Sequence, residues 1–220
     1  MDDAYILSHV DHTLLTAVAA WPEIERLCVE AVEYKTASVC VPPHYIGRIR
    51  TSFPDLNICT VIGFPLGYDA PATKRSAAQT AVGDGADELD MVVNLTDVKN
   101  KDFKSVTEEI AALKKIAGQR ILKVIVETCY LTEAEKTALC RAVTDAGADY
   151  IKTSTGFGTA GAAMEDIILF KKHIGPNVNI KASGGIRTRE DMVAFIEAGC
   201  KRLGTSSAVK LLTGGEAQGY

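Results

Sequence analysis

Short runs of apolar and β-branched residues alternate along the chain with stretches whose apolar positions follow a helical period. Seven runs have the strand pattern: residues 37–41, 57–64, 88–93, 121–128, 149–153, 179–183 and 202–206. A further strand near Ser8–His12 completes a set of eight. Short apolar runs bounded by turn residues are typical of strands buried on both faces of a parallel sheet.

Helical patterns fill the intervals between these strands. Apolar residues from Ile24 to Val32 recur at the spacing of one helix face. Similar stripes predict helices over Phe103–Ala117, Leu139–Ala146 and Met192–Gly199, with others at roughly 72–83 and 162–173. The spacing of a capping box, which begins a helix, occurs in Thr132 with Glu135 and in Thr188 with Asp191.

An internal repeat supports the alternation of helix and strand. Segments 84–92, 146–154 and 198–206 share one order: helix end, glycine, short strand. Eight strand–helix units in 220 residues predict an α/β fold, a single TIM (β/α)8 barrel over residues 1–220 with a short flexible tail from about 213 to 220. The alternative is an open doubly wound sheet, but its glycine-rich fingerprint does not follow the first strand.

Composition and charge narrow the class of protein. Hydrophobic residues make up 47% of the chain, and 28 acidic against 24 basic residues give a net charge of −4. The basic surface of a nucleic-acid-binding protein is therefore not expected. The start, MDDAYILSHVDH, lacks a basic leader, and no long apolar run suggests a membrane span, so we expect a cytoplasmic location. The six cysteines lack zinc or disulfide spacing, so we expect reduced thiols and no metal.

Charged residues interrupt several predicted strands. They are Asp90 in ELDMVV, Lys123 in ILKVIVE, Lys152 in DYIK and Lys181 in NIK. Burial of a charge costs several kcal/mol unless it is paired, and polar residues that end barrel strands face the mouth where active sites lie. A single lysine could equally point outward between helices or pair structurally with a carboxylate. Two lysines on consecutive strands favour a shared site.

Lys152 and Lys181 would lie ~5 Å apart if both faced the barrel mouth. Their repulsion, roughly 3 kcal/mol at an effective dielectric of ~20, would combine with desolvation to bring the pKa of one amine from ~10.4 towards ~7. An unprotonated lysine forms Schiff bases with carbonyl substrates. Asp90 could then move protons or hold the second ammonium group.

Loops rich in glycine and hydroxyl groups follow the last two predicted strands. Ser183-Gly184-Gly185 and Gly204-Thr205-Ser206-Ser207 match the phosphate site common in such barrels, where backbone N–H groups hold the anion. Thr155 and Gly156 could add another wall, and Ser207–Leu212 has the length of the short helix of such a site. Ordinary turn chemistry is the alternative explanation.

Several residues at other strand ends are further candidates. Asp11 and His12 end the first strand, Cys40 ends the second and Lys123 lies in the fifth, and each could face the pocket or belong to the core. Glu127 ends the fifth strand, where we expect it to help hold Lys123.

Seven segments, in chain order, carry a resemblance to a known family: DHTLL, GFPLG, GADELDMVVN, LKVIVET, YIKTSTGFG, IKASGGIRT and GTSS. From about residue 7 to 210 the chain resembles the deoxyribose-phosphate aldolases. The resemblance implies a metal-independent class I aldolase on a TIM barrel, without a cofactor. Such an enzyme reversibly cleaves 2-deoxy-D-ribose 5-phosphate to D-glyceraldehyde 3-phosphate and acetaldehyde, in deoxyribonucleotide catabolism.

The resemblance also implies roles for individual residues. Lys152 would form the Schiff base, Lys181 would lower its pKa and join in proton transfer, and Asp90 would donate or accept protons. The phosphate would lie against Gly156, Gly184, Gly185, Gly204, Ser206 and Ser207. Some members use a C-terminal tyrosine for proton transfer, a role that Tyr220 could fill if the tail folds back. The expected partners are a phosphorylated sugar and further copies in a dimer or tetramer, with no nucleic acid and no membrane.

The chain departs from the family pattern at four positions, which are Pro42, Ala77, Thr96 and Ala208. None is one of the two lysines or Asp90, so the departures concern loop shape and aldehyde preference. Two rival functions remain: a Schiff-base barrel aldolase for a different sugar phosphate, and a non-catalytic barrel that binds sugar phosphates. The presence of both lysines argues against the second.

Overall fold

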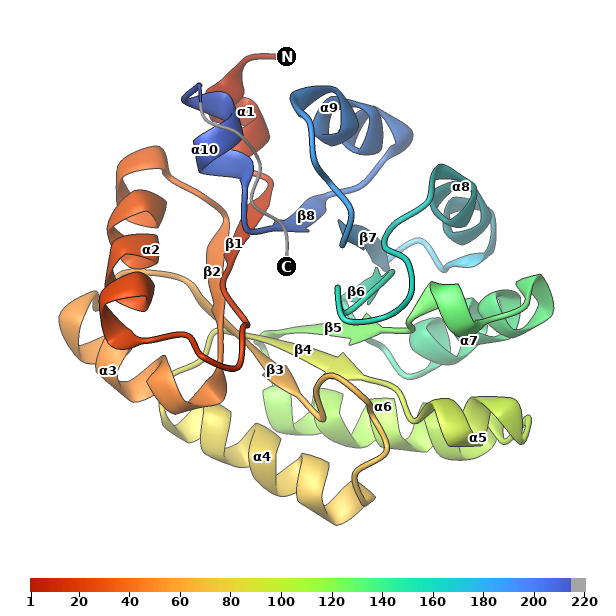
Figure 1. Ribbon diagram of the computed structural model, residues 1–220. Helices are drawn as coiled ribbons and strands as arrows, with labels where there is room; N and C mark the ends of the chain where they lie inside the picture. The colour runs from red at the N-terminus through yellow and green to blue at the C-terminus, as the bar shows by residue number, and fades with distance from the viewer. Residues whose placement is uncertain (215–220) are drawn as a thin grey trace.

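The structure is a computed structural model that describes residues 1–214. Within them, eight parallel strands close into a barrel in chain order, with β8 paired to β1 (Figure 1). The strands are β1 (Val10–Thr13), β2 (Ser38–Val41), β3 (Ile58–Ile62), β4 (Glu88–Val92), β5 (Ile121–Ile125), β6 (Tyr150–Lys152), β7 (Asn179–Ser183) and β8 (Arg202–Thr205). The predicted TIM barrel is confirmed, and the open sheet is wrong.

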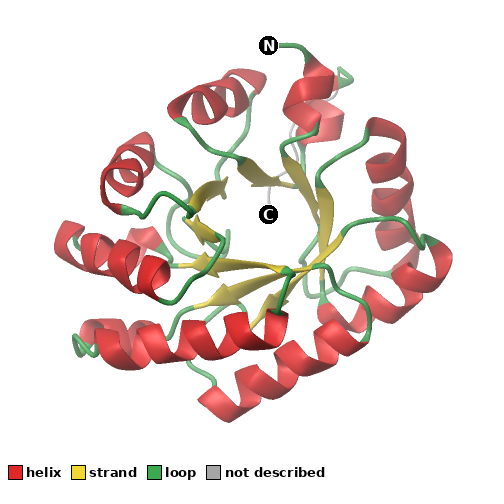
Figure 2. Cartoon of the chain, turned by 180° about the vertical axis from the view of Figure 1, so that it is seen from behind, coloured by secondary structure: helices red, strands yellow, loops and turns green. Residues whose placement is uncertain are grey.

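Helices surround the barrel on its outer side (Figures 1 and 2). They are α1 (Asp3–Leu7), α2 (Trp21–Tyr34), α3 (Ile46–Ser52), α4 (Pro71–Gly83), α5 (Leu95–Lys99), α6 (Phe103–Ala117), α7 (Glu133–Asp145), α8 (Met164–His173), α9 (Arg189–Ala198) and α10 (Ala208–Leu212), with 3-10 turns η1 (Pro43–Tyr45) and η2 (Thr128–Tyr130). Among residues 1–214, no helix is both long and apolar enough to cross a membrane.

Local sequence signals account for most helix starts. The Thr132 side chain accepts from Glu135 N–H at the start of α7, and Thr188 accepts from Asp191 N–H at the start of α9, so both predicted capping boxes are confirmed. The predicted first strand begins two residues late, at Val10, because helix α1, which the sequence pattern did not predict, ends at Leu7 and a turn over Ser8 and His9 follows it. Helices α1, α3 and α5 are too short to show a periodic pattern.

The apolar core lies between the barrel and the helices. Residues that point outward from the strands, such as Leu89 and Val124, join this core with the buried helix faces. The alternate positions point into the barrel, and many of them are charged: Glu88 and Asp90 on either side of Leu89, for example, are 1% and 0% exposed. The interior of the barrel is therefore a polar network rather than the usual layers of aliphatic side chains.

The predicted C-terminal tail, about residues 213 to 220, falls mostly beyond the described residues. Helix α10 ends at Leu212, and Thr213 and Gly214 follow it. Tyr220, with the role foreseen for it, lies outside the described residues.

Candidate active site

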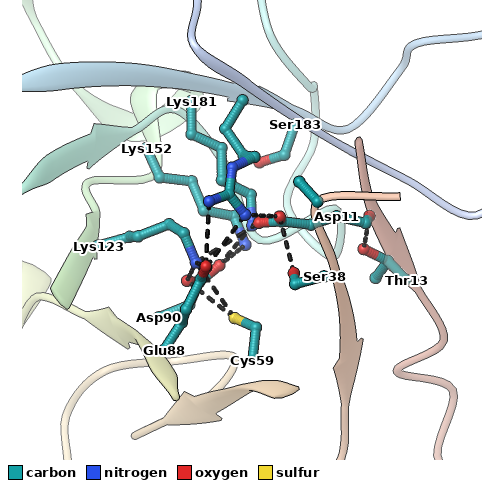
Figure 3. A network of polar contacts seen from close by, with 12 residues as sticks. Asp11, Thr13, Ser38, Cys59, Glu88, Asp90, Lys123, Lys152, Lys181 and Ser183 are labelled. Carbon is teal, nitrogen blue, oxygen red and sulfur yellow. Dashed lines mark hydrogen bonds and ion pairs between the residues drawn. The ribbon is translucent and has the colours of Figure 1, made fainter. Parts of the chain in front are cut away.

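Asp90 lies at the centre of the charged network inside the barrel (Figure 3). Its Oδ2 accepts hydrogen bonds from Lys152 Nζ at 2.8 Å and from Lys181 Nζ at 2.7 Å. Its Oδ1 accepts one from Lys123 Nζ at 2.9 Å. Strand register explains the cluster, because Asp90 pairs with Lys123 across β4 and β5, and Lys152 pairs with Lys181 across β6 and β7.

Two further carboxylates and an arginine complete the network. Asp11 contacts Lys181 and Arg202 and accepts a hydrogen bond from Ser38 Oγ at 2.8 Å. Glu88 contacts Lys123 and accepts from Arg202 Nη2 at 3.0 Å. The strand pattern did not single out Glu88 and Arg202, although each stands two residues before a predicted site residue, where the period of a strand places it on the same face.

The network keeps Asp90 and Lys181 in their charged forms. Burial alone would raise the pKa of Asp90, but Lys123, Lys152 and Lys181 outweigh burial and hold that pKa well below its usual value. Burial would lower the pKa of Lys181, but Asp11 and Asp90 outweigh it, so the pKa of Lys181 is raised. Lys181 is therefore a lasting positive charge beside Lys152.

Only one of the two paired lysines reaches the barrel mouth. Lys152 lines a cavity of about 410 Å³ there, whereas Lys181 is 0% exposed and lies enclosed beneath it. The arrangement in which both lysines face the mouth is therefore not the one observed, because Lys181 does not line the cavity. Its position depends on Gly204, because a Cβ at that residue would lie 3.1 Å from Lys181 Cε.

The loops after β6, β7 and β8 form the walls of the mouth cavity. Its lining includes Thr155, Gly156, Gly184, Gly185, Gly204, Ser206 and Ser207, all named from the sequence. Arg187, which the sequence pattern did not single out, also lines it, with an exposed side chain. No hydrogen bond or ion pair joins its guanidinium group to the rest of the described chain, so Arg187 can receive an anion.

Asp11, Lys123 and Cys40, named as pocket candidates, do not line the mouth cavity. Asp11 and Lys123 belong to the enclosed network, and Cys40 is buried in an apolar cluster that includes Leu15. His12 is buried, with Nε2 2.8 Å from a carboxylate oxygen of Glu30 on α2, which is the contact of a core histidine.

Glu127 does not help to hold Lys123, contrary to expectation. Lys123 is held by Asp90 and Glu88 inside the barrel, whereas Glu127 lies beyond the end of β5. The Glu127 carboxylate accepts a hydrogen bond from Thr155 N–H at 3.2 Å and another from the Thr155 hydroxyl. Thr155 therefore forms part of the cavity wall, but its N–H and hydroxyl groups both donate hydrogen bonds to Glu127.

Two groups of described residues lie close enough to share a metal ion: Cys40 with Cys59 and Asp90, and Asp11 with Cys59 and Glu88. The carboxylates of both groups already contact lysine or arginine side chains. A metal cation in either place would lie against these positive groups, so the donor set fits ion pairs better than a metal.

The resemblance carried by the motifs extends over nearly the whole chain. Residues 6–213 match the model of the DeoC/LacD family aldolases. The chain belongs to this aldolase family. It is accordingly an enzyme of the lyase class, and the resemblance found in the motifs is confirmed.

Individual members of this aldolase family are similar over nearly the whole chain. The chain is 62% identical to a deoxyribose-phosphate aldolase of Clostridium botulinum (strain Eklund 17B / Type B), over 100% of both chains. It is 52% identical to the aldolase of the same name from Clostridioides difficile (strain 630), over 98% of this chain and 99% of that one. A structure described as a tetrameric deoxyribose phosphate aldolase from Aeropyrum pernix superimposes with a TM-score of 0.90 at 33% identity, covering 96% of this chain and 91% of that chain.

Proposed function

We propose that this aldolase reversibly cleaves 2-deoxy-D-ribose 5-phosphate to D-glyceraldehyde 3-phosphate and acetaldehyde through a Schiff base on Lys152. The names of the relatives support the substrate. The observation that carries the mechanism is the position of Lys152, the one lysine among the described residues whose side chain lines the mouth cavity while it also contacts Asp90.

The numbers of cations and carboxylates in the buried network favour Lys152 as the lysine that reacts as a neutral amine. When every group is ionised, the network holds four cations and three carboxylates. Loss of one proton from Lys152 leaves three of each, and the remaining cations, Lys123, Lys181 and Arg202, keep their carboxylate partners. An unprotonated lysine amine is the nucleophile that a Schiff-base reaction needs.

The reaction follows from this nucleophile. Lys152 Nζ attacks C1 of the open-chain sugar, and loss of water gives an iminium ion. The C3 hydroxyl loses its proton while the C2–C3 bond breaks, and the electrons of that bond pass into the iminium to form an enamine. D-Glyceraldehyde 3-phosphate carries C3 to C5 away. Protonation of C2 and hydrolysis then release acetaldehyde and free Lys152.

We propose that Asp90 and Lys181 transfer protons to and from the reacting nitrogen of Lys152. Both lysines donate to the same oxygen of Asp90, which provides a direct hydrogen-bonded route between their ammonium groups. A proton that one lysine gives to this shared oxygen can pass on to the other lysine along the same hydrogen bonds. The positive charge of Lys181 also opposes a second positive charge on Lys152.

We propose that the phosphate lies against the loops that line the cavity after β6, β7 and β8. Gly184 and Gly185 have φ values of 77° and 73°, the left-handed region that favours glycine, and their loop brings backbone groups to the cavity. Gly156, Gly204, Ser206 and Ser207 complete the predicted contacts. Arg187 adds a guanidinium group to the described lining of this cavity, which also contains Lys152.

Borohydride trapping tests the mechanism directly. Incubation with acetaldehyde and borohydride reduces an iminium to a stable secondary amine, and peptide mapping locates it. We expect the label on Lys152, and a label elsewhere contradicts the proposal. Turnover of 2-deoxyribose 5-phosphate, compared with keto-acid and ketose phosphates, tests the substrate.

The remaining expectations stay predictions. A homo-oligomer is supported by the tetrameric relative and is measurable by light scattering. Removal of Tyr220 alone tests whether the chain end assists proton transfer, because proton exchange at C2 of acetaldehyde would slow. The cytoplasmic location and the role in deoxyribonucleotide catabolism remain expectations from the sequence.

A further inference from the structure

Glu127 is a buried acidic residue near the mouth that the mechanism above does not use. Only 3% of it is exposed, and its φ of 55° lies in the left-handed region. Positive φ occurs at two other described residues that are not glycine, Lys35 and Lys101. Both are exposed, at helix ends and turns. Such a conformation is costly for a side-chain-bearing residue and persists where the surroundings impose it.

Backbone contacts on both sides hold Glu127 in this conformation. Val126 N–H donates to the Lys152 carbonyl at 3.0 Å, and Thr128 N–H donates to the Thr153 carbonyl at 3.0 Å. The segment around Glu127 therefore continues the pairing of β5 with β6 past the end of both strands. This continuation places the Glu127 side chain directly beside the loop that leaves β6.

The Glu127 carboxylate fixes the start of that loop. Thr155 N–H lies 3.2 and 3.3 Å from Oε1 and Oε2, and the Thr155 hydroxyl donates to Oε2. The Thr155 hydroxyl oxygen in turn accepts from Phe157 N–H at 3.0 Å. Gly156, held between these two residues with φ of 89°, lines the mouth cavity.

The same loop also passes close to the Glu127 carboxylate at Gly158, the residue after Phe157. A Cβ at Gly158 would lie 3.1 Å from both Cδ and Oε1 of Glu127. The Glu127 side chain thus lies against both Thr155 and Gly158, and there is no room for a larger residue at Gly158.

We propose that Glu127 is a positioning residue that holds the Thr155–Phe157 loop so that Gly156 lies against the phosphate of the substrate. This inference rests on the proposed function, because it takes the phosphate to lie at Gly156. Glu127 acts through Thr155 and makes no hydrogen bond to Lys152, so it affects substrate binding more than the chemical step.

The carboxylate of Glu127 can hold Thr155 in this way, whereas the amide of a glutamine at this position could not. Both oxygens of a carboxylate accept hydrogen bonds, whereas glutamine would present an NH2 donor to the donors of Thr155. Burial raises the pKa of Glu127, although its hydrogen bonds from Thr155 and the charge of Lys152 act in the opposite direction. A buried acidic group whose pKa is shifted beside a cavity is a candidate functional residue.

The test compares Glu127→Gln with the control Glu133→Gln, an exposed residue of α7. Steady-state kinetics are measured with two substrates, deoxyribose 5-phosphate and the unphosphorylated sugar deoxyribose. For Glu127→Gln we expect KM for the phosphorylated sugar to rise about tenfold, which is the effect of losing a hydrogen bond to a charged group. The kcat for the phosphorylated sugar and the KM for the unphosphorylated sugar should each change less than about twofold. Equal losses on both substrates, or no change, overturn the inference. The control should match the parent enzyme.

A second variant tests the same contact from the other side. Thr155→Val keeps the side-chain volume but removes the hydroxyl, so it should also raise KM for the phosphorylated sugar. When Glu127→Gln and Thr155→Val are combined, the rise in KM should be smaller than the product of the two single rises, because both variants break the same contact. If Glu127→Gln does not fold, an unchanged KM in Thr155→Val overturns the inference. A parent enzyme that fails to cleave 2-deoxyribose 5-phosphate overturns the proposed function as well. A parent enzyme that cleaves it, with unshifted variants, overturns only the role of Glu127.

Discussion

Lys152 Nζ donates a hydrogen bond of 2.8 Å to Asp90 Oδ2, although 62 positions separate the two residues in the chain. They stand on β6 and β4, which are not neighbours because β5 lies between them. The contact therefore crosses the barrel interior. Within the described residues, it joins the one lysine that lines the mouth cavity to a network of buried side chains.

Replacement of Lys152 by alanine should abolish turnover and spare the fold. Asp90 keeps Lys123 and Lys181 as partners, so no buried carboxylate loses all its counter-charges. We expect kcat/KM to fall by at least about a thousandfold, borohydride trapping to disappear, and the melting temperature to change little. Lys172→Ala, on the exposed side of α8, serves as the control. Appreciable turnover by Lys152→Ala would show that another group forms the covalent intermediate.

Asp90 should make the protein less stable in acid. Its folded-state pKa lies well below its usual value, while an aspartate in the unfolded chain titrates near ~3.9. As pH falls through about 4 and below, the unfolded chain takes up a proton that the folded chain does not, so the free energy of unfolding decreases. Asp11, whose pKa is also lowered, adds to the same slope.

Asp90→Asn tests this linkage. The variant should lose about 3–5 kcal/mol of stability at neutral pH, because three buried lysines lose a shared carboxylate. Its stability should fall less steeply than that of the parent below pH ~4. Urea unfolding between pH ~3 and ~7 measures both effects. Parallel slopes for the two proteins would mean that Asp90 does not contribute to the acid response.

Gly204→Ala should impair catalysis through Lys181. The new Cβ would lie 2.9 Å from Ser183 Cβ and 3.1 Å from Lys181 Cε, which forces the lysine or strand β8 to move. A displacement of this kind near the reacting groups can cost about a hundredfold in rate, so kcat should fall by about ten- to a hundredfold. Steady-state kinetics measure the effect.

Gly47→Ala is the matched control for that substitution. Gly47 lies within α3, and a Cβ there meets no atom within 4 Å. Alanine is favoured over glycine in a helix by ~1 kcal/mol, so this variant should be slightly more stable and fully active. If both variants behave alike, the close approach at Gly204 does not matter for the reaction.

Arg187→Gln should weaken binding of the phosphorylated substrate. The guanidinium lines the cavity and has no side-chain partner in the described part of the chain, so it is available to a phosphate. We expect KM for the phosphorylated sugar to rise about tenfold at low salt and less at high salt, where the phosphate–arginine attraction is screened. Arg75→Gln, exposed on α4, should leave KM unchanged. A KM that rises equally for the unphosphorylated sugar would argue against a phosphate contact.

Features that depend on neighbouring residues could be predicted from the sequence. The capping boxes at Thr132 and Thr188 each act over three residues, so they mark the starts of α7 and α9 without any knowledge of the rest of the fold. The alternation of strand and helix patterns likewise predicted a parallel sheet, because parallel strands need helical crossovers, and the missing glycine-rich fingerprint favoured the barrel over an open sheet. The charged positions within strands, Asp90 and Lys152 among them, indicated where chemistry could occur.

The tertiary structure alone decided which groups meet. Lys181 is enclosed rather than open to the mouth because Asp11 on β1 and Asp90 on β4 hold it from opposite parts of the closed barrel. Arg202 and Glu88, from β8 and β4, face each other across that interior. Glu127 holds Thr155 through a left-handed turn that its own sequence does not favour. These contacts join residues brought together by barrel closure, and their energies depend on burial and on distances that no local pattern in the sequence contains.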